Sequence, residues 1–167
     1  LGMNTSGGFG EYIRVPASWI VPLPEGMSLK ESMMYGTAGF TAALSVYKLI
    51  RAGVTPSMGD VLVTGATGGV GSVAVSILSK LGFSVVGATG KMEEEQMLLR
   101  LGAKKVMHRA ELNDESGRPM LKGIYAGVID TVGGHMLETA LKTVKYGGGA
   151  TKCGKVAGQP LQTTVYS

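Results

Sequence analysis

Short apolar runs and amphipathic stretches alternate along residues 60–153 of the chain. The runs are rich in β-branched residues and lack polar alternation, which predicts strands that are buried on both faces. The stretches between them have helical period and end at a glycine, as at Gly82 and Gly102. The predicted strands are 61–64, 84–89, 105–108, 127–131 and 149–153, and the predicted helices are 70–81, 93–101 and 136–143.

This order of elements predicts an α/β fold. Strands that alternate with helices form a parallel sheet, and right-handed crossovers place the helices on both of its faces. We therefore expect a Rossmann-type doubly wound parallel sheet. The chain stops after Thr163-Thr164-Val165, where a full dinucleotide fold supplies a sixth strand, so we expect the domain to be truncated there.

Residues 1–35 have a different pattern. Residues 7–15 predict a strand closed by Pro16, and the prolines within 20–26 predict an extended crossing. Ser28 and Glu31 have the spacing of a capping box, which predicts a short helix through about residue 34. A second helix is predicted over 38–52, ended by Gly53. The apolar side chains expected to pack on these two helices are Met33, Met34, Leu44, Val46, Tyr47 and Ile50.

The glycine-rich turn at residues 65–71 is the most informative local sequence. In one register, 66–71 match the fingerprint G-x-G-x-x-G with alanine at the first glycine. Gly68 then permits close approach of a phosphate, and Gly71 permits close packing of helix on strand. In a second register, Thr64-Gly65 begins the T-G-x-x-x-G-x-G turn of short-chain dehydrogenases. Either register predicts a nucleotide at the helix N-terminus, contacted by Thr67, Gly68, Gly69 and Val70.

Composition narrows the classes of protein. With 167 residues, 44% of them hydrophobic and 17% charged, the chain is typical of one globular domain. A net charge of +4 without a basic run gives no support for a nucleic-acid partner. No apolar run has the length of a membrane span, and no signal peptide is visible, so we expect a cytoplasmic protein. Cys153 is the one cysteine and is expected to be a small buried hydrophobe; with His108 and His135 it offers no metal site.

The residues after the second strand decide the choice of cofactor. An NAD site places Asp or Glu there to hold the ribose 2′-hydroxyl, about 20 residues beyond the glycine turn. This chain has Thr89-Gly90-Lys91 instead, which favours the 2′-phosphate of NADP. Arg109, after the third strand, adds a cation near the same phosphate or is a surface arginine. Under the alternative reading, Lys91 is solvated and Glu93 serves as the acid of an NAD site.

Other candidates lie at the ends of the fourth and fifth strands, at the edge where such sheets bind ligands. Asp130 is expected to brace the turn that follows it, with Val132 lining the cleft. The backbone of Gly154 and Lys155 is a candidate for contact with the nicotinamide half of the cofactor.

Several motifs occur together in a characteristic order. They are 8–17, 21–26, 36–42, 101–103, 130–134 and 147–148. Together they resemble the medium-chain dehydrogenase/reductase superfamily, and residues 36–42 with Thr89-Gly90-Lys91 are most similar to its zinc-free quinone oxidoreductase-like branch, particularly the acrylyl-CoA reductase-like subfamily. The resemblance implies that 1–35 close a GroES-like catalytic domain that is mostly absent, and that 36–167 form the NADP-binding domain. It also implies that Thr41 lies against the nicotinamide and that the full-length protein is a homodimer.

The activity implied by the resemblance is NADPH-dependent hydride transfer to a small quinone, enone or enoyl-CoA substrate. No catalytic residue is assigned to this chain, because the hydrogen-bond donors for the substrate are expected in the absent domain. A short-chain dehydrogenase is disfavoured, since Tyr47 and Tyr125 lack the lysine four residues later that this class requires. A non-catalytic NAD(P)-binding sensor or structural module on the same fold stays open.

Overall fold

The computed structural model describes residues 4–5, 7–158 and 160–163, and its contacts divide the chain into the units Leu1–Met33 and Met34–Ser167. The first unit contains a short 3-10 helix, η1 (Ala17–Trp19), and the start of α1 (Leu29–Arg51). The prediction of a strand over 7–15 is wrong, and Phe9 and Tyr12 in that segment are fully exposed. A strand requires a neighbour that pairs with its backbone, and the described part of this unit offers none.

Helix α1 joins the two helices predicted over this region. Gly36 interrupts it with non-helical angles (φ −19°, ψ −127°), close to the predicted break between the helices. The predicted capping box is confirmed. The Ser28 backbone N–H donates to Glu31 Oε2 at 2.8 Å, and the Glu31 N–H donates to Ser28 Oγ at 3.2 Å. Gly53 ends the helix in the left-handed region, with φ +94°.

Burial on α1 differs from the prediction. Val46 is buried as expected, but Leu44, Tyr47, Ile50, Met33 and Met34 are exposed. The buried positions follow a single stripe along the helix, because only one face of a surface helix meets the sheet. This stripe consists of Gly39, Ala42, Ser45, Val46 and Leu49.

Among the described residues of the second unit, five parallel strands form a sheet in the order β3-β2-β1-β4-β5. This is the order expected of a Rossmann-type fold. Thr164 and Val165, at the expected truncation, lie outside the described residues. The strands are β1 (Val61–Thr64), β2 (Val85–Thr89), β3 (Lys105–His108), β4 (Tyr125–Asp130) and β5 (Val144–Lys152). The helices that follow α1 are η2 (Pro56–Met58), α2 (Gly69–Lys80), η3 (Met92–Glu94), α3 (Glu95–Arg100), η4 (Arg109–Leu112) and α4 (Gly134–Lys142).

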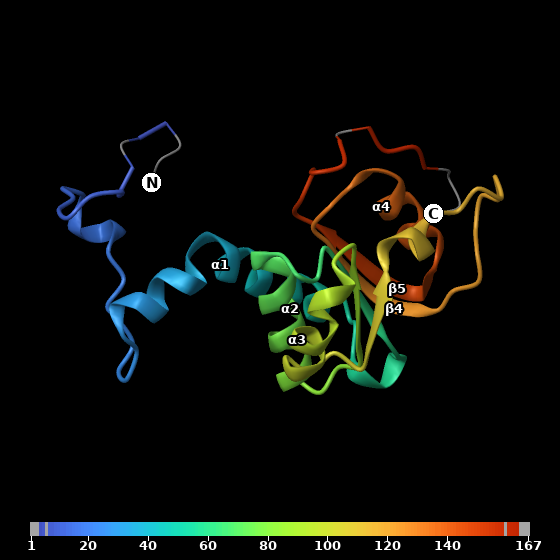
Figure 1. Cartoon of the computed structure of the whole chain (residues 1–167), viewed down its shortest axis with the longest axis horizontal. Coiled ribbons are helices and arrows are strands. Elements are labelled where there is room, and N and C mark those ends of the chain that lie inside the picture. Colours follow the sequence, from blue (N-terminus) through green and yellow to red (C-terminus); the bar gives the residue numbers. More distant parts are fainter. Residues whose placement is uncertain (1–3, 6, 159, 164–167) are drawn as a thin grey trace. The chain divides into compact units, whose positions relative to one another are not determined.

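The sheet is covered on both faces, as predicted. Val61 and Val63 of β1 pack in the cluster that contains residues of α1, α2 and α3, whereas Leu62 packs in the cluster that contains Ala140 of α4. Successive strand residues point to opposite faces, so alternate positions of one apolar run serve the two clusters. Figure 1 shows α2 and α3 next to each other and α4 set apart from these two helices. No helix in the described part of the chain combines the length and the apolar character that a bilayer crossing requires.

Candidate cofactor site

The turn between β1 and α2 depends on two glycines. Gly65 has φ +59°, and a Cβ there would meet the Thr131 hydroxyl and lie 3.0 Å from Val132 Cγ2. A Cβ on Gly71 would collide with the Gly65 carbonyl oxygen and lie 2.8 Å from Ala66 Cα. Gly71 therefore permits close packing of the helix, as predicted, but the backbone that it contacts is the turn directly after β1 and not the strand itself. The left-handed turn is made by Gly65, one residue before the position that the first register assigns to the turn.

The N-terminus of α2 has the features of an anion-binding site. Gly68 is its N-cap and supplies no side-chain cap, and the Gly68 N–H turns back to the Gly65 carbonyl oxygen at 2.9 Å. The first N–H groups of a helix have no partner within the helix. Those of Gly69 and Val70 therefore stand at the positive end of the helix dipole, where a phosphate is stabilised.

A cavity of about 470 Å³ opens beside this helix end. Seven of the predicted site residues line it: Thr67, Gly68, Thr89, Gly90, Lys91, Arg109 and Val132. The remaining described lining residues are Gly65, Ala88, Thr131, Met136 and Val156, none of which was predicted as a contact. Thr131 directly follows β4, so its place at the carboxyl edge of the sheet was available from the sequence. Val156 and Met136 reach the cavity through tertiary packing alone.

Two threonine hydroxyls join the turn after β1 to the end of β2. Thr67 Oγ1 and Thr89 Oγ1 lie 2.9 Å apart, and Thr89 Oγ1 also accepts the Lys91 N–H at 3.0 Å. Thr89 is buried, whereas Lys91 is exposed at the mouth of the cavity. The segment in which an NAD site carries an acid, residues 89–91, thus contains no carboxylate. It contains the Thr89 hydroxyl, which accepts the Lys91 N–H, and the cation of Lys91.

Arg109 reaches the cavity from the neighbouring strand. Thr89 and His108 are register partners at the ends of β2 and β3, so Arg109 follows directly beside Gly90. A capping box holds this backbone: His108 Nδ1 accepts the Ala110 N–H at 3.2 Å, and the His108 N–H donates to Glu111 Oε1 at 2.9 Å. His108 thus has a structural role, as the sequence indicates.

Asp130 braces the turn beneath the cavity. Its fully buried carboxylate accepts hydrogen bonds from Thr64 Oγ1 at 2.7 Å and from the Gly133 N–H at 2.8 Å. Thr131 is also bonded to Thr64, the last residue of β1, because its hydroxyl donates to the Thr64 carbonyl oxygen at 2.8 Å. The expectation that Asp130 holds this turn while Val132 lines the cleft agrees with this geometry.

The other predicted contacts, Thr41, Gly69, Val70, Gly154 and Lys155, are not among the described residues that line this cavity. Thr41 lines a separate cavity of about 280 Å³ together with Cys153, and its hydroxyl donates to the Thr37 carbonyl oxygen at 2.7 Å. Gly154 packs on the turn after β4, where a Cβ would collide with the Thr131 carbonyl oxygen. Lys155 follows it, with its Cα 3.5 Å from the position of a Cβ on Gly133.

Cys153 corrects one sequence prediction. It is exposed, because it lies one residue beyond β5, the last strand in the order of the described sheet, and β5 itself has no buried residue. Its thiol donates to the Asp130 carbonyl oxygen at 3.3 Å, and partial burial raises its pKa. The described residues contain no group of three or more His, Cys, Asp or Glu side chains that could hold a metal ion.

Comparison with known proteins agrees with the fold. Residues 69–166 match the family described as zinc-binding dehydrogenase, and this chain belongs to that family. Acrylyl-CoA reductase AcuI of Ruegeria pomeroyi is 46% identical over 159 residues, which cover 95% of this chain and 48% of AcuI. YhfP of Bacillus subtilis, provisionally named a quinone oxidoreductase, is 48% identical over 166 residues, which cover 99% of this chain and 50% of YhfP.

Solved structures extend the comparison. The yhdH oxidoreductase of Salmonella enterica in complex with NADP is 45% identical, with a TM-score of 0.92, over 99% of this chain and 50% of that one. YhfP has been crystallised with NAD bound; that structure has a TM-score of 0.86 over 91% of this chain and 46% of that one. The chain therefore spans about half the length of the relatives that it matches.

Proposed function

We propose that this chain is the cofactor-binding portion of an NADPH-dependent, zinc-independent oxidoreductase that transfers hydride to a quinone or an α,β-unsaturated acyl or carbonyl substrate. The proposal rests on the family to which the chain belongs and on its similarity to AcuI and YhfP. The single observation that carries the choice of cofactor is the pair of cations, Lys91 and Arg109, at the mouth of the cavity.

Charge in the cavity favours a 2′-phosphate. Lys91 and Arg109 both line it, and none of its described lining residues carries a carboxylate. Glu93, the alternative acid of an NAD site, lies on η3 and is exposed; it is not among these lining residues. A guanidinium and an ammonium next to a phosphate form charge-assisted hydrogen bonds, whereas a ribose 2′-hydroxyl gains less from two cations.

The remaining residues fit the rest of a dinucleotide. The free N–H groups at the start of α2 suit a pyrophosphate, and Gly68 lets it approach the backbone without obstruction from a Cβ. Nicotinamide, when bound, supplies the hydride-transfer chemistry. Thr41, Val132 and the Gly154–Lys155 backbone are the residues proposed to orient that half of the cofactor.

A pair of titrations tests the cofactor. Binding of NADPH and NADH is measured by calorimetry, and we expect tighter binding of NADPH. Lys91→Ala should weaken NADPH by about tenfold more than NADH, because it removes one charge-assisted contact to the 2′-phosphate. Equal binding of the two cofactors by the unaltered chain, or an equal loss of both in the variant, contradicts the proposal.

The wider assignments follow from the resemblance to the medium-chain dehydrogenases. We propose that 1–35 close a catalytic domain and that 36–167 bind the cofactor; the division of contacts between Met33 and Met34 supports this. We also propose a cytoplasmic homodimer. Oxidation of NADPH by the full-length protein with acryloyl-CoA or with quinones tests the substrate class. Tight NADPH binding without turnover of either class would favour the sensor module instead.

A further inference from the structure

We propose that Gly90 is a positioning residue for Arg109, and that the missing side chain at position 90 sets the preference for NADP. A Cβ built on Gly90 would lie 2.8 Å from Arg109 Nε and 3.0 Å from Arg109 Cδ and Cζ. The guanidinium end of Arg109 therefore occupies the space that any other residue at position 90 would fill. The inference rests on the proposed function, since it concerns how the 2′-phosphate site is built.

The backbone does not explain the glycine. Gly90 is not among the glycines with positive φ, unlike Gly65, Gly82 or Gly102. An L side chain at this position is therefore compatible with the backbone conformation. What excludes it is the contact with Arg109, so the requirement for glycine comes from the neighbouring side chain.

The position of Arg109 is set independently of Gly90. Register pairing of Thr89 with His108 places the two loops side by side, and the capping box of His108 and Glu111 holds the start of η4. Because the Arg109 backbone is held in this way, a side chain at position 90 moves the flexible end of Arg109 and leaves the strand ends in place. Arg109 is exposed, so its end has room to move into solvent.

The choice at position 90 is thus between two states of the site. With glycine, the guanidinium lies over the loop beside Lys91, and two cations face the cavity. With a larger side chain, the guanidinium is displaced and Lys91 acts alone. An acid at this position would displace Arg109 and would also supply the carboxylate that holds a ribose 2′-hydroxyl.

A double-mutant cycle tests this arrangement. Gly90→Ala, Arg109→Gln and the double variant of the 167-residue chain are titrated with NADPH and NADH, and with adenosine 2′,5′-bisphosphate and AMP. The bisphosphate and AMP differ by the 2′-phosphate alone and contain no nicotinamide. Circular dichroism and thermal unfolding confirm that each variant is folded.

We expect each single variant to lower the ratio of NADPH to NADH affinity by about tenfold, and the ratio of bisphosphate to AMP affinity by a similar factor. The double variant should lose no more than Arg109→Gln alone, because Gly90 acts through that side chain. Additive losses, a retained ratio in Gly90→Ala, or failure of Gly90→Ala to fold each overturn the inference. The same titrations separate failure of this inference from failure of the proposed function. If the unaltered chain shows no preference for NADPH, the proposed function fails. If it shows the preference and Arg109→Gln lowers it but Gly90→Ala does not, only the role of Gly90 fails.

Discussion

The hydroxyl oxygens of Thr67 and Thr89 lie 2.9 Å apart and join the glycine-rich turn after β1 to the end of β2. Thr89 Oγ1 also accepts the Lys91 N–H. One buried oxygen therefore links the turn after β1 to the loop that carries Lys91. Buried polar networks of this kind hold loops in a single arrangement when every member is satisfied.

Thr89→Val is expected to destabilise the protein by about 1 kcal/mol, because it leaves the partly buried Lys91 N–H and Thr67 hydroxyl without their partner. Thr67→Val should cost less, since Thr89 then keeps its bond to Lys91. Denaturant unfolding of the two variants measures the difference. A Thr67→Val variant that is the less stable of the two would contradict this account of the network.

Gly71→Ala is expected to destabilise the protein by about 1–3 kcal/mol or more, because its Cβ would meet the backbone of Gly65 and Ala66, which cannot move aside without shifting the turn. NADPH affinity should fall with it, since the helix end carries the N–H groups. Ser72→Ala on the same helical turn is the matched control and should have a small effect. Thermal unfolding with a parallel NADPH titration checks both, and a Gly71→Ala variant as stable as the control would be evidence against close packing here.

Asp130→Asn is expected to destabilise the turn after β4 by about 2 kcal/mol, because the carboxylate accepts from several donors and an amide places an NH₂ group against one of them. The Thr64 hydroxyl and the Gly133 N–H are the donors affected. The control is Glu115→Gln, which makes the same chemical change at a carboxylate that is exposed. Urea unfolding at neutral pH measures the stability of both variants. If Asp130→Asn is as stable as Glu115→Gln, Asp130 does not hold this turn.

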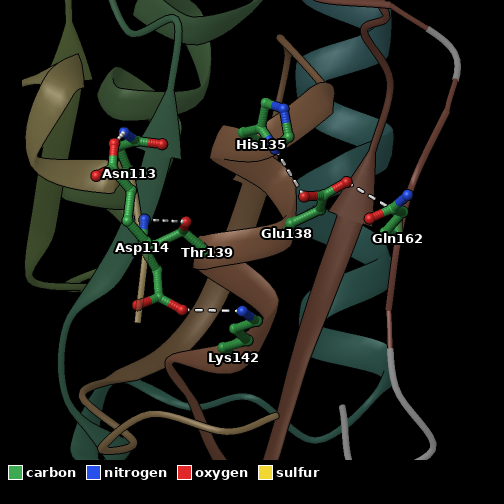
Figure 2. A network of polar contacts seen from close by, with 8 residues as sticks. Asn113, Asp114, His135, Glu138, Thr139, Lys142 and Gln162 are labelled. Carbon is green, nitrogen blue, oxygen red and sulfur yellow. Dashed lines mark hydrogen bonds and ion pairs between the residues drawn. The ribbon is translucent and has the colours of Figure 1, made fainter. Parts of the chain in front are cut away.

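A polar network on α4 makes stability depend on acid pH. Figure 2 shows the ion pair between Asp114 and Lys142 (2.8 Å), the bond from the Asp114 N–H to Thr139 Oγ1 and the contact between Glu138 and the Gln162 N–H. The Asp114 side chain is 8% exposed. Hydrogen bonds from Lys142 and from Ser116 lower the pKa of Asp114 from 3.8 to about 2.

Because this pKa is lower in the folded chain than in the unfolded chain, the stabilisation is present above pH 4 and is lost as the pH falls toward 2. Asp114→Asn should therefore flatten the decline of stability between pH 4 and 2. Lys142→Met should destabilise more at pH 7 than Asp114→Asn, since it leaves a largely buried carboxylate without its partner. Unfolding curves at several pH values measure both effects. If the loss of stability between pH 4 and 2 is unchanged in Asp114→Asn, carboxylates other than Asp114 cause it.

Local chemistry accounts for most of what could be predicted. The Ser28–Glu31 capping box and the glycine stops at Gly53, Gly82 and Gly102 involve residues close in sequence, and they appear where the pattern placed them. The central strands β1, β2 and β4 were also recognisable, because every residue in them is buried and burial on both faces leaves uninterrupted apolar runs. The prediction of burial on both faces is wrong for β5, which has no buried residue. Bounds were less accurate: β5 begins at Val144, five residues before the predicted start at 149.

The sequence by itself determined the order of strands and helices, the glycine turn and the absence of an acid after β2, because these depend on neighbours a few residues away. Only the tertiary structure decided which stripe of α1 is buried and that residues 7–15 form no strand, because both depend on whether a distant surface is present to pack against. It also decided that Arg109 lies over Gly90. That contact follows from the register of β2 and β3, which the backbone pairing of two separate segments sets.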